Sequence, residues 1–217
     1  MIISKQMLDP KAEELNLCQK NIEDISPLRE LIQLKYLALE ENQIVDLQPL
    51  ASLVNLETLY LYHNKISDIT PVKKLAKLIK LSFWDNQVED ISPLAGLTEL
   101  KELGLGNNRV SNLSPLKNLK NLYEADLEHN QITDASPLKS IKGIAHLYLS
   151  DNKIENIEPL AELKNLTELG LYKNKISDIS PLFHLKKLKK LELQDNPISD
   201  TQIYNLKEVL SECEIIF

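Results

Sequence analysis

Histidine and cysteine are the side chains of this chain best suited to bind a metal or to act as nucleophiles, and both are scarce. The 217 residues include His63, His129, His146 and His184, together with Cys18 and Cys213. His63 and His129 are three periods apart in a 22-residue repeat described below, which predicts a separation of about 14 Å, too far for one metal ion. The cysteines lie near opposite ends, so they offer no disulfide framework, and their scarcity fits a reducing compartment. We expect neither a metal nor a cofactor.

Carboxylate pairs are the other candidates for chemistry. Glu124 and Asp126 could mimic an acid/base dyad, but carboxylates on a solvated strand face usually keep ordinary pKa values. The sequence contains no H-E-x-x-H, C-x-x-C or G-x-S-x-G motif and no glycine-rich phosphate loop. Since no signature of a catalytic pocket is present, the sequence predicts a protein that is not an enzyme.

The composition is that of a folded, acidic protein. Apolar residues make up 43% of the chain and charged residues 26%, with only 5 glycines and 10 prolines. The net charge of −7 argues against nucleic-acid binding, which needs a basic footprint, and favours basic or mixed-charge partners. Lysine pairs such as Lys186–Lys187 and Lys189–Lys190 are interpreted as solvated surface.

The N-terminal segment and the hydropathy pattern bear on location. Residues 1–17 contain no apolar run behind a basic start, so no signal peptide is predicted. No stretch approaches the length of a membrane span, so membrane insertion is not expected. If Met1 is the native start, we expect a cytoplasmic protein; a secreted protein that has lost its leader is the alternative.

A repeat of 22 residues organises the chain. Each unit begins with a leucine column at Leu15, Leu37, Leu59, Leu81, Leu103, Ala125, Leu147, Leu169 and Leu191. A second apolar residue follows two positions later in every unit. An asparagine column follows at Asn42, Asn64, Asn86, Asn108, Asn130, Asn152, Asn174 and Asn196, with Lys20 in the first unit. A proline column completes the unit at Pro27, Pro49, Pro71, Pro93, Pro115, Pro137, Pro159 and Pro181.

Each column has a physical meaning. The L-x-L pattern predicts a short strand with both leucines on one face. Asparagine suits the following turn because its amide can satisfy backbone groups that no strand pairs. The fixed proline excludes a continuous helix, and leucines spaced by three then favour a short 3₁₀ or helical turn. One unit cannot bury its leucines alone, so the units must stack.

The sequence therefore predicts a single α/β repeat solenoid over residues 1–217, with a parallel sheet on the concave face and 3₁₀ or helical turns on the convex face. We expect an N-terminal cap over 1–14, nine repeats over 15–200 with the last one partial, and a C-terminal cap over 201–217. Met7 and Leu8 would cover the first edge only thinly, so a monomer with weak end-to-end association is expected.

The C-terminal cap is predicted to be a helix followed by a short strand. Asp200 is the expected N-cap, and the apolar stripe consists of Ile203, Leu206, Val209 and Leu210. The sixth repeat is irregular, since Ala125 and Ala135 replace large side chains and Gly143 follows. It is either a soft joint or is compensated by neighbouring residues.

The unit L-x-L-x-x-N-x-I-x-D-I-x-P-L-x-x-L-x-x-L resembles the 22-residue class of leucine-rich repeats, over about residues 15–200. Bacterial internalins and the repeat-built regulatory subunits of type-one protein phosphatase belong to this class. The chain shows neither the signal peptide nor the immunoglobulin-like segment of internalins, and it resembles small cytoplasmic bacterial members more closely. The resemblance implies a curved horseshoe that binds proteins through its concave strand face.

Aromatic and acidic side chains collect at the outward positions of that face. The predicted protein-binding residues are Tyr36, Tyr60, Tyr62, Trp84, Glu102, Glu124, Asp126, Glu128, Tyr148 and Tyr172. Tyrosine and tryptophan are enriched at binding hot spots, although these rings could instead only pack on one another. We call the four carboxylates Glu102, Glu124, Asp126 and Glu128 the acidic strip. They repel one another unless a basic partner binds; the alternative is that the strip is only a solvated acidic surface. Gly104, Gly106 and Gly170 would leave gaps for a partner's bulky groups.

The resulting prediction is a non-catalytic module that recognises a protein partner on its concave face, with the acidic side chains suited to a basic segment of that partner. The alternatives are a structural or envelope-associated repeat protein, and an inhibitor or regulatory subunit of an enzyme such as a phosphatase. The sequence does not specify the partner.

Overall fold

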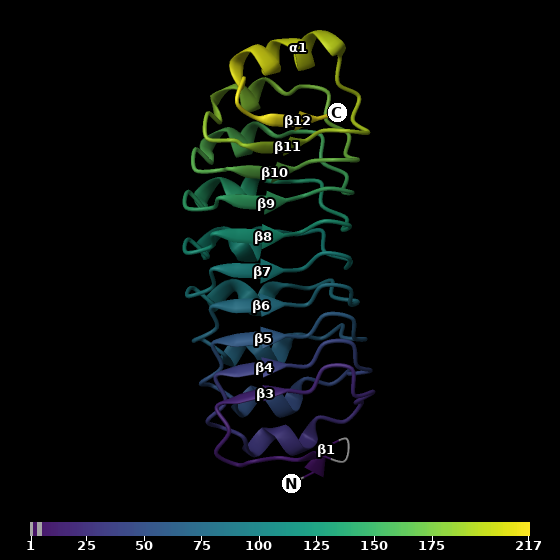
Figure 1. Ribbon diagram of the computed structural model, residues 1–217, viewed down its shortest axis with the longest axis vertical. Helices are drawn as coiled ribbons and strands as arrows, with labels where there is room; N and C mark the ends of the chain where they lie inside the picture. The colour runs from purple at the N-terminus through teal and green to yellow at the C-terminus, as the bar shows by residue number, and fades with distance from the viewer. Residues whose placement is uncertain (1, 4–5) are drawn as a thin grey trace.

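A computed structural model describes residues 2–3 and 6–217 and contains one ten-stranded parallel sheet (Figure 1). Its strands are β3 Glu14–Asn16, β4 Tyr36–Ala38, β5 Thr58–Tyr60, β6 Lys80–Ser82, β7 Glu102–Gly104, β8 Glu124–Asp126, β9 His146–Tyr148, β10 Glu168–Gly170, β11 Lys190–Glu192 and β12 Glu214–Ile216. They follow one another in chain order, so every strand pairs with the strands of the adjacent units. The curved parallel sheet of a repeat solenoid is therefore confirmed.

Eight 3₁₀ helices lie behind the sheet, on the convex side. They are η1 Ser26–Glu30, η2 Gln48–Ser52, η3 Thr70–Lys74, η4 Ser92–Gly96, η5 Ser114–Asn118, η6 Ser136–Ser140, η7 Glu158–Glu162 and η8 Ser180–His184. Each has the column proline in its first turn, where the ring presets φ and the missing N–H costs no hydrogen bond. A side chain two residues before the helix, usually aspartate, accepts the first N–H, as Asp90 does from Ser92 at 2.8 Å.

The leucine columns form one continuous core between the sheet and the 3₁₀ helices. Leu37, Leu59 and Leu147 have no exposed surface, and the same holds for most core positions along the stack. Consecutive leucines stand directly opposite each other, as in the register Leu37↔Leu59. Burial of apolar surface between units, rather than within one unit, therefore stabilises the fold.

The asparagine column is a buried ladder of hydrogen bonds next to the sheet. The Asn130 side chain donates to the carbonyls of Leu105 and Leu127 at 2.9 and 3.2 Å, and it accepts the Val110 N–H at 2.8 Å. It thus joins its own unit to the preceding one. The residue before each asparagine has a positive φ, for example 51° at His129, and this turns the chain away from the strand.

The C-terminal cap consists of helix α1, Asp200–Val209, and strand β12. The expected N-cap is wrong by one residue, because Ser199 precedes the helix in an extended conformation and Asp200 already lies in the first turn. Val209 is 37% exposed and does not belong to the buried stripe, whereas Ile203, Leu206 and Leu210 are buried. The Gln202 side chain donates to Ser177 O at 2.8 Å and accepts the Ile179 N–H at 3.0 Å, which fixes the helix to the last 3₁₀ unit.

The N-terminal cap is a short antiparallel pair, β1 Ile2–Ile3 with β2 Gln6–Met7. Leu8 is buried as expected, but Met7 is 78% exposed, and Ile3 takes its place in the core. Positions 1, 4 and 5 of the predicted cap lie outside the described residues.

The irregular sixth unit keeps its place in the sheet. Ala125 pairs with Leu103 and Leu147 in the same register as the leucines of other units. Both Ala125 and Ala135 are buried. A soft joint at this unit stays a prediction.

Candidate protein-binding face

The ten predicted binding residues lie in three columns on the outer surface of the sheet. The strands carry the first two columns, which are in register across β4 to β10, and the third column follows each strand after one further core residue. All ten side chains are partly buried, so they are neither core residues nor freely solvated groups. The strand alternation that buries the leucines therefore presents these residues on the opposite face.

The aromatic side chains near the N-terminal end form edge-to-face pairs. Tyr36 packs on Tyr60, with ring centroids 6.0 Å apart. Tyr62 and Trp84 do not contact each other through their rings; each packs on His63, at 5.4 and 5.1 Å. His63 was not among the predicted residues, although the sequence places it between Tyr62 and the ladder asparagine.

The expectation that Gly106 leaves an open gap is wrong. A Cβ atom at this position would lie 2.5 Å from Trp84 Cδ1 and Nε1 and 2.8 Å from Asp126 Oδ1. The indole and the carboxylate therefore occupy the space above the glycine. Gly170 is covered in the same way, by Ser150 Oγ at 2.9 Å and Glu128 Oε1 at 3.4 Å from the corresponding point. These glycines allow side chains of this chain, rather than of a partner, to lie close to the sheet.

Basic side chains neutralise part of the acidic strip. Lys80 Nζ lies 2.8 Å from Glu102 Oε1, and His146 Nδ1 lies 3.3 Å from Glu124 Oε2. Asp126 and Glu128 form no ion pair with any described residue. Asp126 and Glu128 are therefore the two predicted carboxylates of the strip without an ion-pair partner among the described residues, although His129 lies close enough to lower the pKa of Asp126.

The prediction that the strip keeps ordinary pKa values is wrong for Asp126. Burial, together with the neighbouring carboxylates of Glu128 and Glu124, raises the pKa of its carboxyl from 3.8 to about 6. The Glu128 N–H, which donates to Asp126 Oδ1 at 3.1 Å, acts in the opposite direction. Asp126 therefore loses its proton close to neutral pH.

A hollow of about 200 Å³ opens beside Asp126 on the concave face. Gly104 and Leu103 lie along its base, and Tyr60, Lys80, Ser82, Glu102, Glu124 and Asp126 surround them. Ser82 Oγ would lie 2.7 Å from a Cβ at Gly104, so a side chain of this chain lies close to this glycine as well. The hollow brings an aromatic ring and three carboxylates together.

Tyrosines also lie on the C-terminal side of the strip. The Tyr148 hydroxyl donates to Glu168 Oε2 at 2.7 Å, and burial together with this bond raises the pKa of Tyr148 well above its usual range. Tyr123, outside the predicted set, packs edge-to-face on His146 at 5.0 Å and is half exposed.

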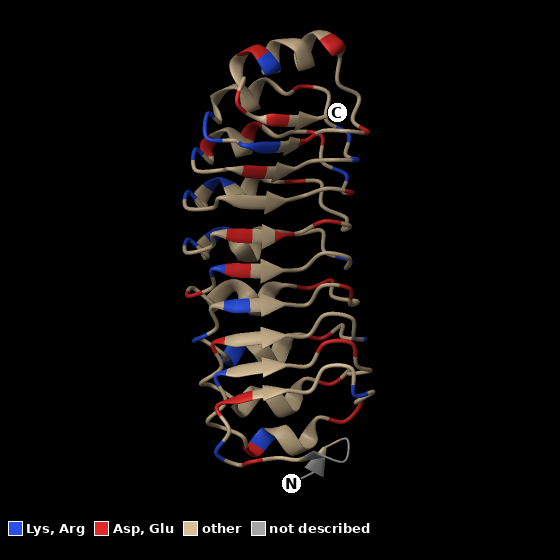
Figure 2. Cartoon of the chain, in the orientation of Figure 1, with Lys and Arg blue, Asp and Glu red and all other residues tan. Residues whose placement is uncertain are grey.

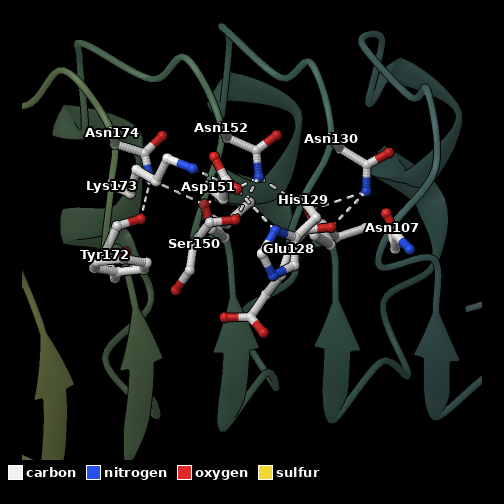
Figure 3. Close-up of polar contacts among 12 residues, drawn as sticks. Asn107, Glu128, His129, Asn130, Ser150, Asp151, Asn152, Tyr172, Lys173 and Asn174 are labelled. Carbon is white, nitrogen blue, oxygen red and sulfur yellow. Dashed lines mark hydrogen bonds and ion pairs between the residues drawn. The ribbon is translucent and has the colours of Figure 1, made fainter. Parts of the chain in front are cut away.

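A second polar row lies at the rim of the sheet and was missed from the sequence. It is formed by the residues that precede the ladder asparagines, with side chains that bond from unit to unit (Figure 3). His129 Nδ1 lies 2.8 Å from Asp151 Oδ2, and Lys173 Nζ lies 3.0 Å from the same oxygen. Asp85 likewise bonds to His63 and Asn107. The sequence contained a signal for this row, because a polar or charged residue precedes every asparagine of the ladder.

Comparisons with known proteins agree with this architecture. The sequence matches the family described as leucine-rich repeats (2 copies) at residues 32–74, 76–118, 117–162 and 164–210, which is most of the chain. The chain is a leucine-rich-repeat protein. No curated protein matches it.

Solved structures identify the kind of leucine-rich-repeat protein. Internalin C2 of Listeria monocytogenes is 34% identical with a TM-score of 0.82, over 87% of this chain and 83% of that one. An internalin (inlF) of the same organism is 32% identical with a TM-score of 0.78, over 94% of this chain and 66% of that one. A leucine-rich-repeat protein of Leptospira interrogans is 25% identical with a TM-score of 0.79, over 94% and 60%. The repeats are thus internalin-like, in a chain that spans only part of these relatives.

Across residues 2–3 and 6–217, no group of three or more histidine, cysteine or carboxylate side chains is placed to hold a metal ion. Nor does the described part of this leucine-rich-repeat protein contain a helix of the length and apolarity needed to cross a bilayer.

Proposed function

We propose that the concave face binds a protein partner, with tyrosine and tryptophan side chains as anchors and the acidic strip as the site for a basic segment. Leucine-rich repeats of the internalin-like type commonly act as protein-interaction modules and are generally non-catalytic scaffolds. What we propose for this chain is that the concave face is the surface used and that its aromatic and acidic side chains make the contacts.

The observation that carries it is that Asp126 and Glu128 lack an ion-pair partner among the described residues and that Asp126 lines the Gly104 hollow. Both carboxylates are partly buried, and no described cation lies within ion-pair distance of either. A lysine or arginine side chain of a partner would supply the missing charge in surroundings where water screens it less. The hollow of about 200 Å³ exceeds the volume of one water molecule severalfold, so it has room for the end of such a side chain.

The aromatic side chains flank the strip on both sides along the stack. Tyr36, Tyr60, Tyr62 and Trp84 lie toward the N-terminal end, and Tyr148 and Tyr172 lie toward the C-terminal end. Partly exposed aromatic rings around a charged centre resemble the composition of binding hot spots. The packing of Tyr62 and Trp84 on His63 also favours binding, because rings that are already fixed lose little entropy when a partner binds.

The test is affinity capture from a lysate of the source organism with the unmodified chain and two double variants. Trp84→Ala with Asp126→Lys changes the proposed site. Tyr204→Ala with Glu89→Lys removes an aromatic ring and reverses one charge on exposed residues elsewhere, so it is the matched control.

We expect a partner that the unmodified chain and the control capture and that the site variant loses, with all three proteins showing the same circular dichroism. A partner retained by the site variant would place recognition on another surface. If none of the three proteins captures a partner, the structural or envelope-associated role is favoured instead.

A further inference from the structure

The loops that lead into the strands carry a further column of exposed residues, which lies outside both the concave face and the polar row at its rim. We call it the loop column; it consists of Ile32, Val54, Ala76, Thr98, Lys120, Lys142, Lys164 and Lys186. Each member lies between a 3₁₀ helix and the next strand, and all eight are exposed. The first three are apolar, the fourth is a threonine and the last four are lysines, so the column is apolar at its N-terminal end and positively charged at its C-terminal end.

Hydrogen bonds between units join three of the seven steps along the loop column. The Asn55 side chain donates to the carbonyl of Ile32 at 2.9 Å, and Asn121 donates to Thr98 at 2.9 Å. Asn165 makes the same bond to Lys142 at 2.8 Å. Members of neighbouring units therefore stand one strand spacing apart, about 4.8 Å at the sheet.

The basic half of the column concentrates positive charge on an acidic protein. Figure 2 shows lysines on the loops that lead into β8 to β11. Lys142 pairs with Glu162 at 2.6 Å, and the charge of Lys164 also acts on Glu162, although neither Lys120 nor Lys164 forms an ion pair within the described part of the chain. Like charges in adjacent units are unfavourable without a counter-charge. An anionic partner would relieve this repulsion.

A hollow of about 340 Å³ deepens this surface between η5 and η6. Lys117, Lys120 and Lys139 surround it with Ser114, Ser136 and Asn118, and no carboxylate lines it. A comparable hollow of about 420 Å³ lies between η1 and η2, near the apolar half; Pro49 and Ala51 line it together with the polar residues Arg29, Glu30, Gln48, Ser52 and Lys74. Each half of the column thus has a depression beside it that a side chain could enter.

We infer that the loop column is a second docking surface, for an extended acidic protein segment that carries apolar residues at one end. Charge complementarity selects glutamate or aspartate for the lysine half, and Ile32 with Val54, which are 49% and 47% exposed, selects apolar residues for the other. The column spans seven unit steps, or about 34 Å at the sheet spacing. An extended segment of about ten residues has this length.

The test uses the whole chain and a fluorescein-labelled peptide of three leucines, two glycines and five glutamates, measured by fluorescence anisotropy at about 50 mM salt. The site variant is Lys120→Glu with Lys164→Glu. The control is Lys65→Glu with Lys153→Glu, exposed lysines in the turns that follow the strands. Each of the two substitutions in a pair changes the charge by −2, so both variants go from −7 to −11.

We expect saturable binding that the site variant weakens at least about tenfold and the control changes by less than about twofold. Ile32→Ser with Val54→Ser should weaken binding of this peptide but not of a peptide with serines in place of the leucines, which assigns the apolar contact. No saturation below about 1 mM, or an equal loss in the control, would overturn the inference. Equal competition by an oligothymidine of the same charge would also overturn it, in favour of a nucleic-acid surface.

Discussion

At Asp126, burial and the neighbouring negative charges both act against ionisation of the side chain. Its side chain lies against Trp84 above Gly106 and beside the carboxylates of Glu124 and Glu128. Ionisation at this position costs free energy in the absence of a partner, because both desolvation and like charge disfavour it. A basic group that binds there would offset this cost, so partner binding and deprotonation are coupled.

Stability should therefore depend on pH through Asp126. Its pKa is 3.8 when unperturbed and about 6 in the folded chain, so between these values the folded state binds more protons than the unfolded state. The free energy of unfolding falls as pH rises through this window, by on the order of 3 kcal/mol. Asp126→Asn should remove this part of the slope in urea unfolding between about pH 4 and pH 7. An unchanged slope would show that the pKa of Asp126 is the same in the folded and the unfolded chain. A captured basic partner should bind more tightly as pH rises through the same range.

Asn130 shows the opposite case, a buried polar side chain with every bond satisfied. Replacement by alanine leaves the carbonyls of Leu105 and Leu127 and the N–H of Val110 without their present partner. We expect Asn130→Ala to lower the free energy of unfolding by about 2–4 kcal/mol, since each unsatisfied buried group costs about 1–3 kcal/mol. The neighbouring exposed Gln131→Ala should change it by less than about 0.5 kcal/mol. Similar values for the two variants in chemical denaturation would contradict the structural role of the ladder.

At the scale of elements, the strands and 3₁₀ helices could be predicted because each has a local signal that repeats. L-x-L fixes the strand, asparagine its end and proline the following turn, and repetition makes each signal stronger. The cap was less predictable because it occurs once. Ser199 and Asp200 are both good N-caps, and only the packing of Ile203 and Leu206 against the last unit decides between them.

The candidate face was predictable in composition but not in side-chain packing. Alternation along the strands places Trp84 and Asp126 outward, as expected. That both would cover Gly106 depends on rotamers and on contacts between units, which the one-dimensional pattern does not contain. The same limit explains why His63 was missed as the ring on which Tyr62 and Trp84 pack.

Helix α1 is the element that ends the core at the C-terminal side. Leu206 has no exposed surface, so Leu206→Ala should destabilise the protein by about 2–4 kcal/mol through lost burial and a cavity. Tyr204 in the same helix is 65% exposed, and Tyr204→Ala should cost less than about 0.5 kcal/mol. Thermal unfolding of the two variants would compare them. Equal shifts would mean that the helix does not cover the core.

The whole molecule is a one-dimensional stack in which each unit contacts only its neighbours. Central units have two neighbours and end units have one, so local opening should be easier at the ends. We expect the amides of β3 and β12 to exchange with deuterium at least about tenfold faster than those of β6 to β9. Hydrogen exchange read by mass spectrometry would measure this. Uniform protection along the stack would indicate a single cooperative unit instead.

The side-chain bonds between units join residues only about one period apart, such as Asn42 with Ile22 and Tyr148 with Glu168, each 20 positions apart. A unit inserted or deleted in the middle of the stack would therefore meet the same surfaces above and below. Duplication of a gene segment that encodes one period would lengthen both the concave face and the loop column by a single step without altering the rest. The length of both surfaces is therefore set by the number of repeat units, which evolution or protein design can change.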